Sequence, residues 1–233
     1  MIEQRSSGAS GYVSVPEAAA DLGVEPQAIR RLIRDGELPA KKEIGRWIIP
    51  ASEVDKRRSL GPRAGRRFSP ARAWGLIHLA GGQPAAWLDR EARWRMARQL
   101  EARPLEALRW QLVARGIAHG YEAHPASVER LRNDPVVMLT GVAGAEAAAL
   151  GIVGSDEHIE AYVDASRLDD IVKRYHLRPS LEPNVVLRPM PEFGWPSPRP
   201  DVAPTVAIAL DLLENRDPRA RQLGRQLLEQ TKK

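Results

Sequence analysis

The chain has 233 residues, of which 43% are hydrophobic, and a formal net charge of +5, so it can bury hydrophobic cores and we expect a globular protein. The absence of cysteine excludes disulfides and thiolate metal sites, and the five histidines show no ligand spacing, so we expect no metal and no cofactor. No apolar run reaches about 18 residues and the first ten residues lack a signal-peptide core, which predicts a cytoplasmic protein with no membrane partner.

The positive charge is concentrated in the first part of the chain. Residues 1–67 hold 13 Lys and Arg against 9 Asp and Glu, whereas residues 68–233 hold 22 against 21. This asymmetry favours an anionic partner for the amino-terminal part, and nucleic acid is the commonest such partner. A solvated basic surface without a partner explains the charge equally well.

The first predicted helix begins after Ser14. Ser14 can cap it, Pro16 suits its first turn, and Glu17 stands three residues after the cap, as in a capping box. The helix is expected to reach Leu22 and to end at Gly23, a residue type that tolerates a left-handed conformation.

A second helix is predicted from Pro26 to about Asp35, with Gly36 as its stop. At 100° per residue, four polar side chains fall within about 60° of one direction, and the apolar ones fall opposite. The polar stripe consists of Gln27, Arg30, Arg31 and Arg34, and the apolar stripe of Ala28, Ile29, Leu32 and Ile33. Two short helices joined by a tight turn with glycine are typical of a helix-turn-helix, whose second helix enters the major groove of DNA.

A hairpin is predicted next, from strands 40–43 and 46–49 joined at Ile44-Gly45. Its basic residues, Lys41, Lys42 and Arg46, stand where they could contact phosphate or the minor groove. Trp47 is interpreted as a core side chain and not as a base-stacking group. A third helix over 52–58 is expected to close a domain that spans residues 10–58.

Residues 12–58 resemble the excisionase/MerR-type winged helix-turn-helix family in the spacing of "SVPEAAADLGV", "RLIRDGELPAKK" and "GRWIIP". The resemblance implies a recognition helix in the major groove of double-stranded DNA, carrying Gln27, Arg30, Arg31 and Arg34. It also implies a wing on the backbone or minor groove, carrying Lys41, Lys42 and Arg46. One departure is Glu25, which stands where the family usually has a Ser or Thr cap. The alternative for the arginines is a solvated helix face.

Residues 59–68 are predicted to form a basic linker, because the stretch from Lys56 to Pro70 is rich in Gly, Pro and Arg and lacks periodicity. Its arginines could add nonspecific phosphate affinity, or the tether could contact nothing. These arginines are Arg57, Arg58, Arg63, Arg66 and Arg67.

Residues 69–120 are predicted to be a tryptophan-rich helical segment. Helices are expected from Ser69-Pro70, over 89–100 and over 104–113. Its tryptophans, Trp74, Trp87, Trp94 and Trp110, recur at helical spacing, which favours core packing over a ligand cage.

Residues 121–233 are predicted to form an α+β domain. Strands are expected at "VVMLT", "HIEAYVD" and "NVVLRPMP", and helices at "GVAGAEAAALGI", "SRLDDIVKRYHL", 203–214 and after Asp217-Pro218. With the helical segments before it, the fold class is α+β and mostly helical. No nucleotide-binding loop or hydrolase motif appears, so we expect no enzyme.

The motifs "LTGVAGAEAAALGI", "LDDIVKRYHLRPS" and "VAPTVAIALDLLENRDPRARQLGRQLL" resemble the carboxyl-terminal domain of AbiEi-type antitoxins of type IV toxin-antitoxin systems. The resemblance implies repression of the protein's own operon and a nucleotidyltransferase-like toxin as partner. The function expected from the whole sequence is an autoregulating, antitoxin-like DNA-binding regulator; the alternative is a regulator that responds to a small molecule. A homodimer, if formed, would use the helical middle or the carboxyl-terminal domain, because no long heptad run is present.

Overall fold

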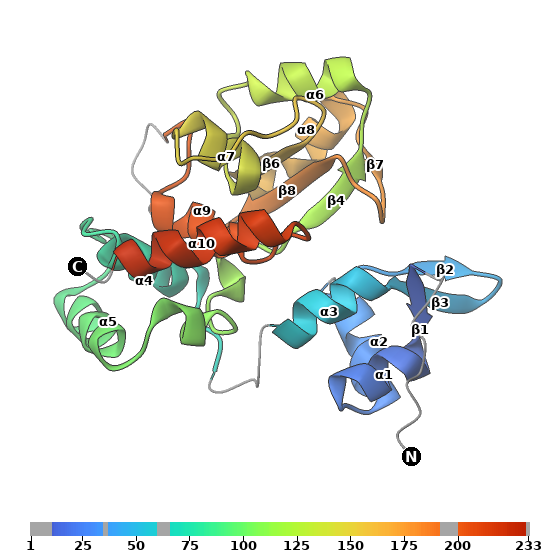
Figure 1. Cartoon of the computed structure of the whole chain (residues 1–233), viewed down its shortest axis with the longest axis horizontal. Coiled ribbons are helices and arrows are strands. Elements are labelled where there is room, and N and C mark those ends of the chain that lie inside the picture. Colours follow the sequence, from blue (N-terminus) through green and yellow to red (C-terminus); the bar gives the residue numbers. More distant parts are fainter. Residues whose placement is uncertain (1–10, 35–36, 60–65, 192–199, 232–233) are drawn as a thin grey trace. The chain divides into compact units, whose positions relative to one another are not determined.

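The computed structural model describes residues 11–34, 37–59, 66–191 and 200–231. The chain divides into two compact units, residues 1–61 and 62–233, and each is described by itself (Figure 1). Together they have the expected α+β architecture, with mostly helical structure beside two sheets. Among the described helices, none combines the length and the apolar character needed to cross a membrane.

The amino-terminal unit is a small three-stranded antiparallel sheet with three helices. Its elements are β1 (Tyr12–Ser14), α1 (Val15–Leu22), α2 (Pro26–Arg34), β2 (Lys41–Glu43), β3 (Arg46–Pro50) and α3 (Ala51–Ser59). The strand order is β1-β3-β2, so β3 is central. The two helices, the hairpin and the third helix predicted from the sequence are confirmed. The predicted stop at Asp35-Gly36 lies outside the described residues.

Helix α1 begins and ends as its sequence predicts. The Glu17 amide donates to Ser14 Oγ over 3.4 Å, and the Ser14 amide donates to Glu17 Oε2 over 2.7 Å, which completes a capping box. The bond from the Ser14 amide, with that from its hydroxyl, lowers the pKa of Glu17. Gly23 ends the helix with a φ of 62°.

The carboxyl-terminal unit is built on a five-stranded sheet of order β5-β6-β8-β4-β7. Its strands are β4 (His119–Glu122), β5 (Met138–Leu139), β6 (Ile159–Asp164), β7 (Arg178–Pro179) and β8 (Val185–Met190). The pair β6 and β8 is parallel, and the other neighbours are antiparallel.

Helices cover both faces of this sheet (Figure 1). Ile159, Ala161 and Val163 alternate along β6 and are buried in one core with side chains of α6 (Pro125–Arg132) and α8 (Leu168–Arg174). Tyr162 points to the opposite face, into a second core. That core includes side chains of α4 (Pro70–Ala80), α5 (Arg90–Ala102), α7 (Gly141–Ala147), α9 (Thr205–Leu212) and α10 (Pro218–Gln230). The tryptophan-rich segment and the following α+β part are therefore one packed body.

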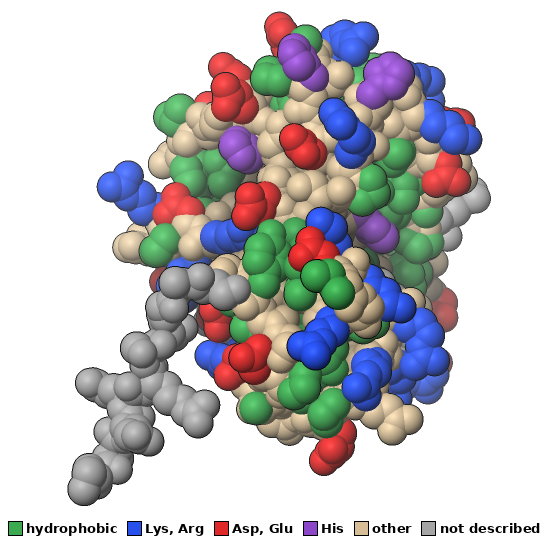
Figure 2. All heavy atoms as spheres, turned by 90° about the vertical axis from the view of Figure 1, so that its right-hand side faces the viewer, with side chains coloured by type: hydrophobic (Ala, Val, Ile, Leu, Met, Phe, Trp, Pro, Cys, Tyr) green, Lys and Arg blue, Asp and Glu red, His purple; other side chains and the backbone are tan. Residues whose placement is uncertain are grey.

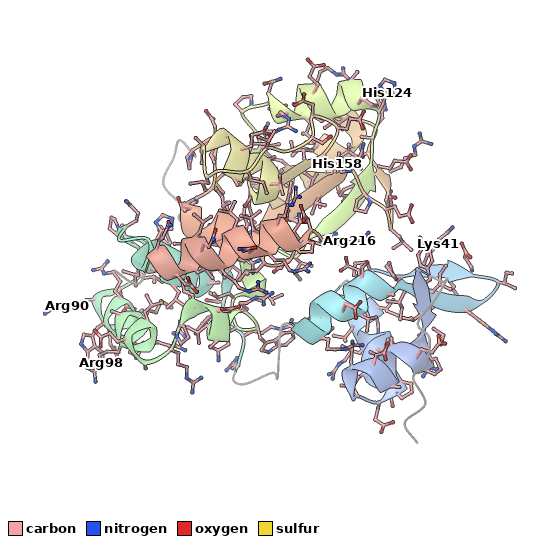
Figure 3. All side chains as sticks on the ribbon, viewed as in Figure 1. Lys41, Arg90, Arg98, His124, His158 and Arg216 are labelled. Carbon is pink, nitrogen blue, oxygen red and sulfur yellow. The ribbon has the colours of Figure 1, made fainter. Side chains whose placement is uncertain are left out.

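The tryptophans of this unit do not share one environment. Trp74 and Trp110 are buried, and the half-buried Trp87 donates its indole N–H to the Ala71 carbonyl over 3.0 Å. These three fit the expected core role. Trp94 does not, because it is 64% exposed on α5, beside Arg98 (Figure 3). Helical spacing alone did not distinguish the outer face of α5 from the inner one.

The prediction of a regular helix over 104–113 is wrong. Two 3-10 turns, Leu105–Leu108 and Val113–Arg115, stand in its place. Leu105, Leu108 and Leu112 are all buried, as are the polar residues Arg109 and Gln111 between them. A regular helix would bury one stripe of side chains, whereas this segment is enclosed on several sides, so tertiary packing determines its path.

Four further elements of the structure were not predicted from the sequence. They are the strands β1, β4 and β7 and the helix α6.

A buried ion network joins the sheet to the helices of the second core. Arg115 Nη2 donates to Asp211 Oδ1 over 2.7 Å and to Glu214 Oε1 over 2.6 Å. Arg188 on β8 donates to Glu160 over 2.6 Å and to Glu214 over 2.9 Å. Burial lowers the pKa of Arg115, but Glu214 and Asp211 outweigh it and raise that pKa above its ordinary value, so Arg115 stays protonated. The network fixes the position of α9 against the sheet.

Candidate nucleic-acid interface

The second helix of the amino-terminal unit has one face in the core and one in solvent. Ile29 and Leu32 are buried with Val15, Ala18 and Ile49 in the core of the unit. The four residues of the predicted recognition stripe, Gln27, Arg30, Arg31 and Arg34, are all exposed. The amphipathic division predicted from the sequence is therefore present in the fold. That these side chains read DNA stays a prediction.

The cations of this exposed face have no ion-pair partner among the residues that the structure describes. No ion pair joins Arg30, Arg31 or Arg34 to another residue in the described part of the chain. Guanidinium groups that have no carboxylate partner keep their donors available for phosphate or base edges. The stripe is chemically suited to a polyanion.

The hairpin β2–β3 forms the predicted wing. In its antiparallel register Lys42 lies opposite Trp47, and Glu43 lies opposite Arg46. Trp47 is half-buried and packs on the core of the unit, as expected for a core side chain. Lys41, Lys42 and Arg46 are exposed, and Figure 3 labels Lys41 on the hairpin.

The three wing cations differ in their surroundings. Lys41 Nζ lies 2.7 Å from Glu43 Oε1, and this hydrogen bond and charge raise the pKa of Lys41. Among described residues, Lys42 and Arg46 have no ion-pair partner. Because Glu43 pairs with Lys41, the charges of Lys42 and Arg46 are the more available for an anionic partner.

Two arginines of the basic stretch from Lys56 to Pro70 lie in the last helix of the amino-terminal domain. Arg57 and Arg58 lie in α3 and pair with acids: Arg57 with Glu37 over 3.3 Å, and Arg58 with Asp21 and Asp55 over 3.5 and 3.3 Å. Of the two alternatives for these arginines, phosphate contact is the less favoured, because both guanidinium groups form ion pairs within the domain. Further along, the Arg67 guanidinium lies 4.3 Å from the ring centroid of Trp110, and Arg66 is exposed. Arg63 lies outside the described residues.

Figure 2 shows Lys and Arg side chains, in blue, gathered on the lower part of the face that it draws. Acidic side chains are present there too.

Glu25, the departure from the family pattern, is exposed directly before α2, and its carbonyl accepts from the Ala28 amide over 2.9 Å. A carboxylate at this end disfavours close approach to phosphate.

The comparison with protein families matches residues 12–58 to a family described as "Helix-turn-helix domain". Residues 12–58 are therefore similar to helix-turn-helix domains, in agreement with the fold of the amino-terminal unit. This supports a DNA-binding regulator of excisionase-like type, and the match covers about a fifth of the chain. Neither the curated proteins nor the solved structures provide a match. The resemblance of the carboxyl-terminal part to AbiEi-type antitoxins stays a prediction.

Proposed function

We propose that the protein recognises a specific duplex sequence through its helix-turn-helix domain and represses transcription of its own operon. The observation that carries this proposal is α2, whose buried stripe anchors it while Gln27, Arg30, Arg31 and Arg34 stand together in solvent. A helix supported on one face and cationic on the other is the arrangement with which helix-turn-helix proteins enter the major groove. In this proposal the chain binds DNA and catalyses no reaction. It acts in the cytoplasm.

Arginine and glutamine supply the chemistry that such recognition needs. A guanidinium can donate two parallel hydrogen bonds to guanine O6 and N7, and each such pair contributes about 1–3 kcal/mol of discrimination. A glutamine amide can both donate to and accept from adenine. Lys42 and Arg46 on the wing would contact phosphates, which adds affinity without sequence preference.

The carboxyl-terminal unit gives the proposal its second part, an antitoxin-like role. It is supported by the resemblance of "LDDIVKRYHLRPS" and the segment 202–228 to AbiEi-type antitoxins. In this role the unit would bind a nucleotidyltransferase-like toxin or a second copy of the chain, while the helix-turn-helix domain controls expression. Co-purification with the product of an adjacent nucleotidyltransferase-like gene tests this part, and the absence of such a neighbour would leave an ordinary regulator.

DNA binding is tested by fluorescence anisotropy with a labelled duplex from the protein's own upstream region and a scrambled duplex of equal length. The double variant Arg30→Ala with Arg34→Ala should lose the preference for the upstream duplex. Retention of full preference by this variant would remove α2 as the recognition helix. The double variant Arg95→Ala with Arg98→Ala, on exposed positions of α5, removes the same number of positive charges and should preserve the preference.

A further inference from the structure

The tip of the wing carries an isolated, fully exposed hydrophobic side chain. Ile44 has a relative exposure of 103%, the highest among the large hydrophobic residues recorded as exposed. It occupies the first central position of the two-residue turn between β2 and β3, and Gly45 occupies the second. The Ile44 side chain therefore adds nothing to the core of the domain.

The backbone at Ile44 is unfavourable for this residue type. Ile44 has a φ of 44° and Gly45 a φ of 77°, so both central residues are left-handed, as in a type I′ turn. Glycine, asparagine and aspartate suit these positions, whereas a β-branched residue with positive φ is a genuine outlier. Isoleucine at this position thus costs stability without contributing packing, and residues held in such conformations cluster at functional sites.

The surroundings of Ile44 indicate which partner its side chain meets. Residues 41–46 hold Lys41, Lys42 and Arg46 against one acid, Glu43, so the exposed Ile44 side chain is flanked by a net positive charge. One side chain is far too small for a protein interface, which buries about 800 Å² on each partner. A single apolar side chain at the end of a hairpin can enter the minor groove of DNA, which is about 6 Å wide and receives apolar wedges from architectural proteins.

We infer that the Ile44 side chain inserts into the minor groove of the bound duplex as a wedge. There it partly unstacks one base step and bends the DNA. Proteins that bind the minor groove insert apolar side chains between base steps in this way and kink the duplex by about 20–90°. Flanking cations such as Lys42 and Arg46 would hold the neighbouring phosphates. The inference rests on the proposed function, because it requires the helix-turn-helix domain to be on DNA.

The test compares Ile44→Asn with Ile44→Leu in the full chain. Asparagine suits the left-handed turn and removes the apolar wedge, whereas leucine keeps an apolar side chain of the same size. Affinity for the upstream duplex is measured by anisotropy across a salt series. Bending is measured by energy transfer between dyes at the duplex ends, and unstacking by the fluorescence of 2-aminopurine placed along the site.

The expected result is that Ile44→Asn binds about tenfold more weakly or worse, which corresponds to losing the burial of one large aliphatic side chain. It should also lose the bend and the 2-aminopurine signal, while its salt dependence stays that of the wild type because the phosphate contacts remain. Ile44→Leu should retain all three properties. Thermal unfolding should show Ile44→Asn to be at least as stable as the wild type, which excludes misfolding as the cause.

Equal affinity and equal bending for the wild type and Ile44→Asn would overturn the wedge and leave the proposed function intact. A wild-type duplex complex without any bend or 2-aminopurine signal would overturn it as well. A wild-type chain that binds no duplex at low ionic strength would instead overturn the proposed function, and with it the wedge.

Discussion

Arg57 Nη2 of α3 lies 3.3 Å from a carboxylate oxygen of Glu37, and the two side chains are only 10% and 14% exposed. Arg57 also donates to the Glu37 carbonyl over 3.3 Å. Glu37 precedes the wing strand β2. Helix α3 therefore holds Glu37, which lies between α2 and the wing strand, and the pair links the fold of the domain to the geometry of the candidate interface.

Replacing Arg57 by Met should destabilise the helix-turn-helix domain by about 1–3 kcal/mol, because the Glu37 carboxylate keeps its burial and loses a charged donor. Urea unfolding followed by hydrogen exchange of peptides from residues 12–58 measures this loss. Arg58→Met is the matched control, since the Arg58 side chain is 53% exposed and its removal should cost well under about 1 kcal/mol. Equal losses for both variants would contradict the structural role of Arg57.

The buried ion network of the carboxyl-terminal unit predicts a larger effect. Asp211→Asn should destabilise this unit by about 3–5 kcal/mol, because it removes a charge that faces the buried Arg115 and leaves part of that cation uncompensated. Thermal unfolding of the full chain measures it. Arg225→Gln is the control, since Arg225 is exposed and lies 4.0 Å from Glu106. A small effect for Asp211→Asn would show that the network relaxes around the lost charge.

Local signals explain what the sequence could predict. The start of α1 follows from Ser14, Pro16 and Glu17, which act within four residues, and the amphipathic α2 follows from its own periodicity. The exposed stripe of the candidate interface was therefore accessible to sequence reasoning. The sequence marks a turn at Ile44-Gly45, but isoleucine is not typical of such a turn, so its type gives no signal of the full exposure of Ile44.

What sequence reasoning missed depends on distant residues. Strand β1 has three residues and exists by pairing with β3, which follows it by more than thirty residues. Strand β4 contains Gly120, where a side chain would meet the Ser180 carbonyl oxygen at 2.9 Å, so a close backbone approach explains a glycine that reads as a break. Asp211 stands alone among the apolar residues of α9, and that isolation is a signal for a buried partner.

Two half-buried histidines predict how the carboxyl-terminal unit responds to acid. Burial lowers the pKa of His78 and of His119 below the ordinary 6.5, so both bind a proton less readily in the folded chain than in the unfolded chain. Unfolding then takes up protons at any pH between the lowered values and 6.5. The free energy of unfolding therefore keeps its full value above about pH 6.5, the pKa of an unfolded histidine. It falls as the pH drops from there through the lowered pKa values of the two histidines.

Urea midpoints at pH 7.5 and pH 5.5 measure this dependence, and the midpoint should be lower at pH 5.5. The double variant His78→Gln with His119→Gln should show a smaller difference between the two conditions. Asp134, whose pKa is lowered mainly by the Tyr175 hydroxyl against the effect of burial, stays ionised at both pH values and does not contribute. An unchanged difference in the double variant would assign the acid response to other groups.

The two adjacent lysines of the wing, Lys41 and Lys42, are predicted to differ in their effect on the salt dependence of DNA binding. Lys42→Ala should weaken binding to the upstream and scrambled duplexes alike and reduce the slope of log K against log salt by about 0.9, as expected for one lost phosphate contact. Lys41→Ala should change the slope less, because Glu43 lies 2.7 Å from Lys41 and already offsets its charge. Anisotropy titrations over a salt series measure both slopes. Since the two residues are neighbours with the same charge, equal slopes would mean that the pairing with Glu43 does not persist on DNA, and unchanged slopes would place the wing away from the phosphates.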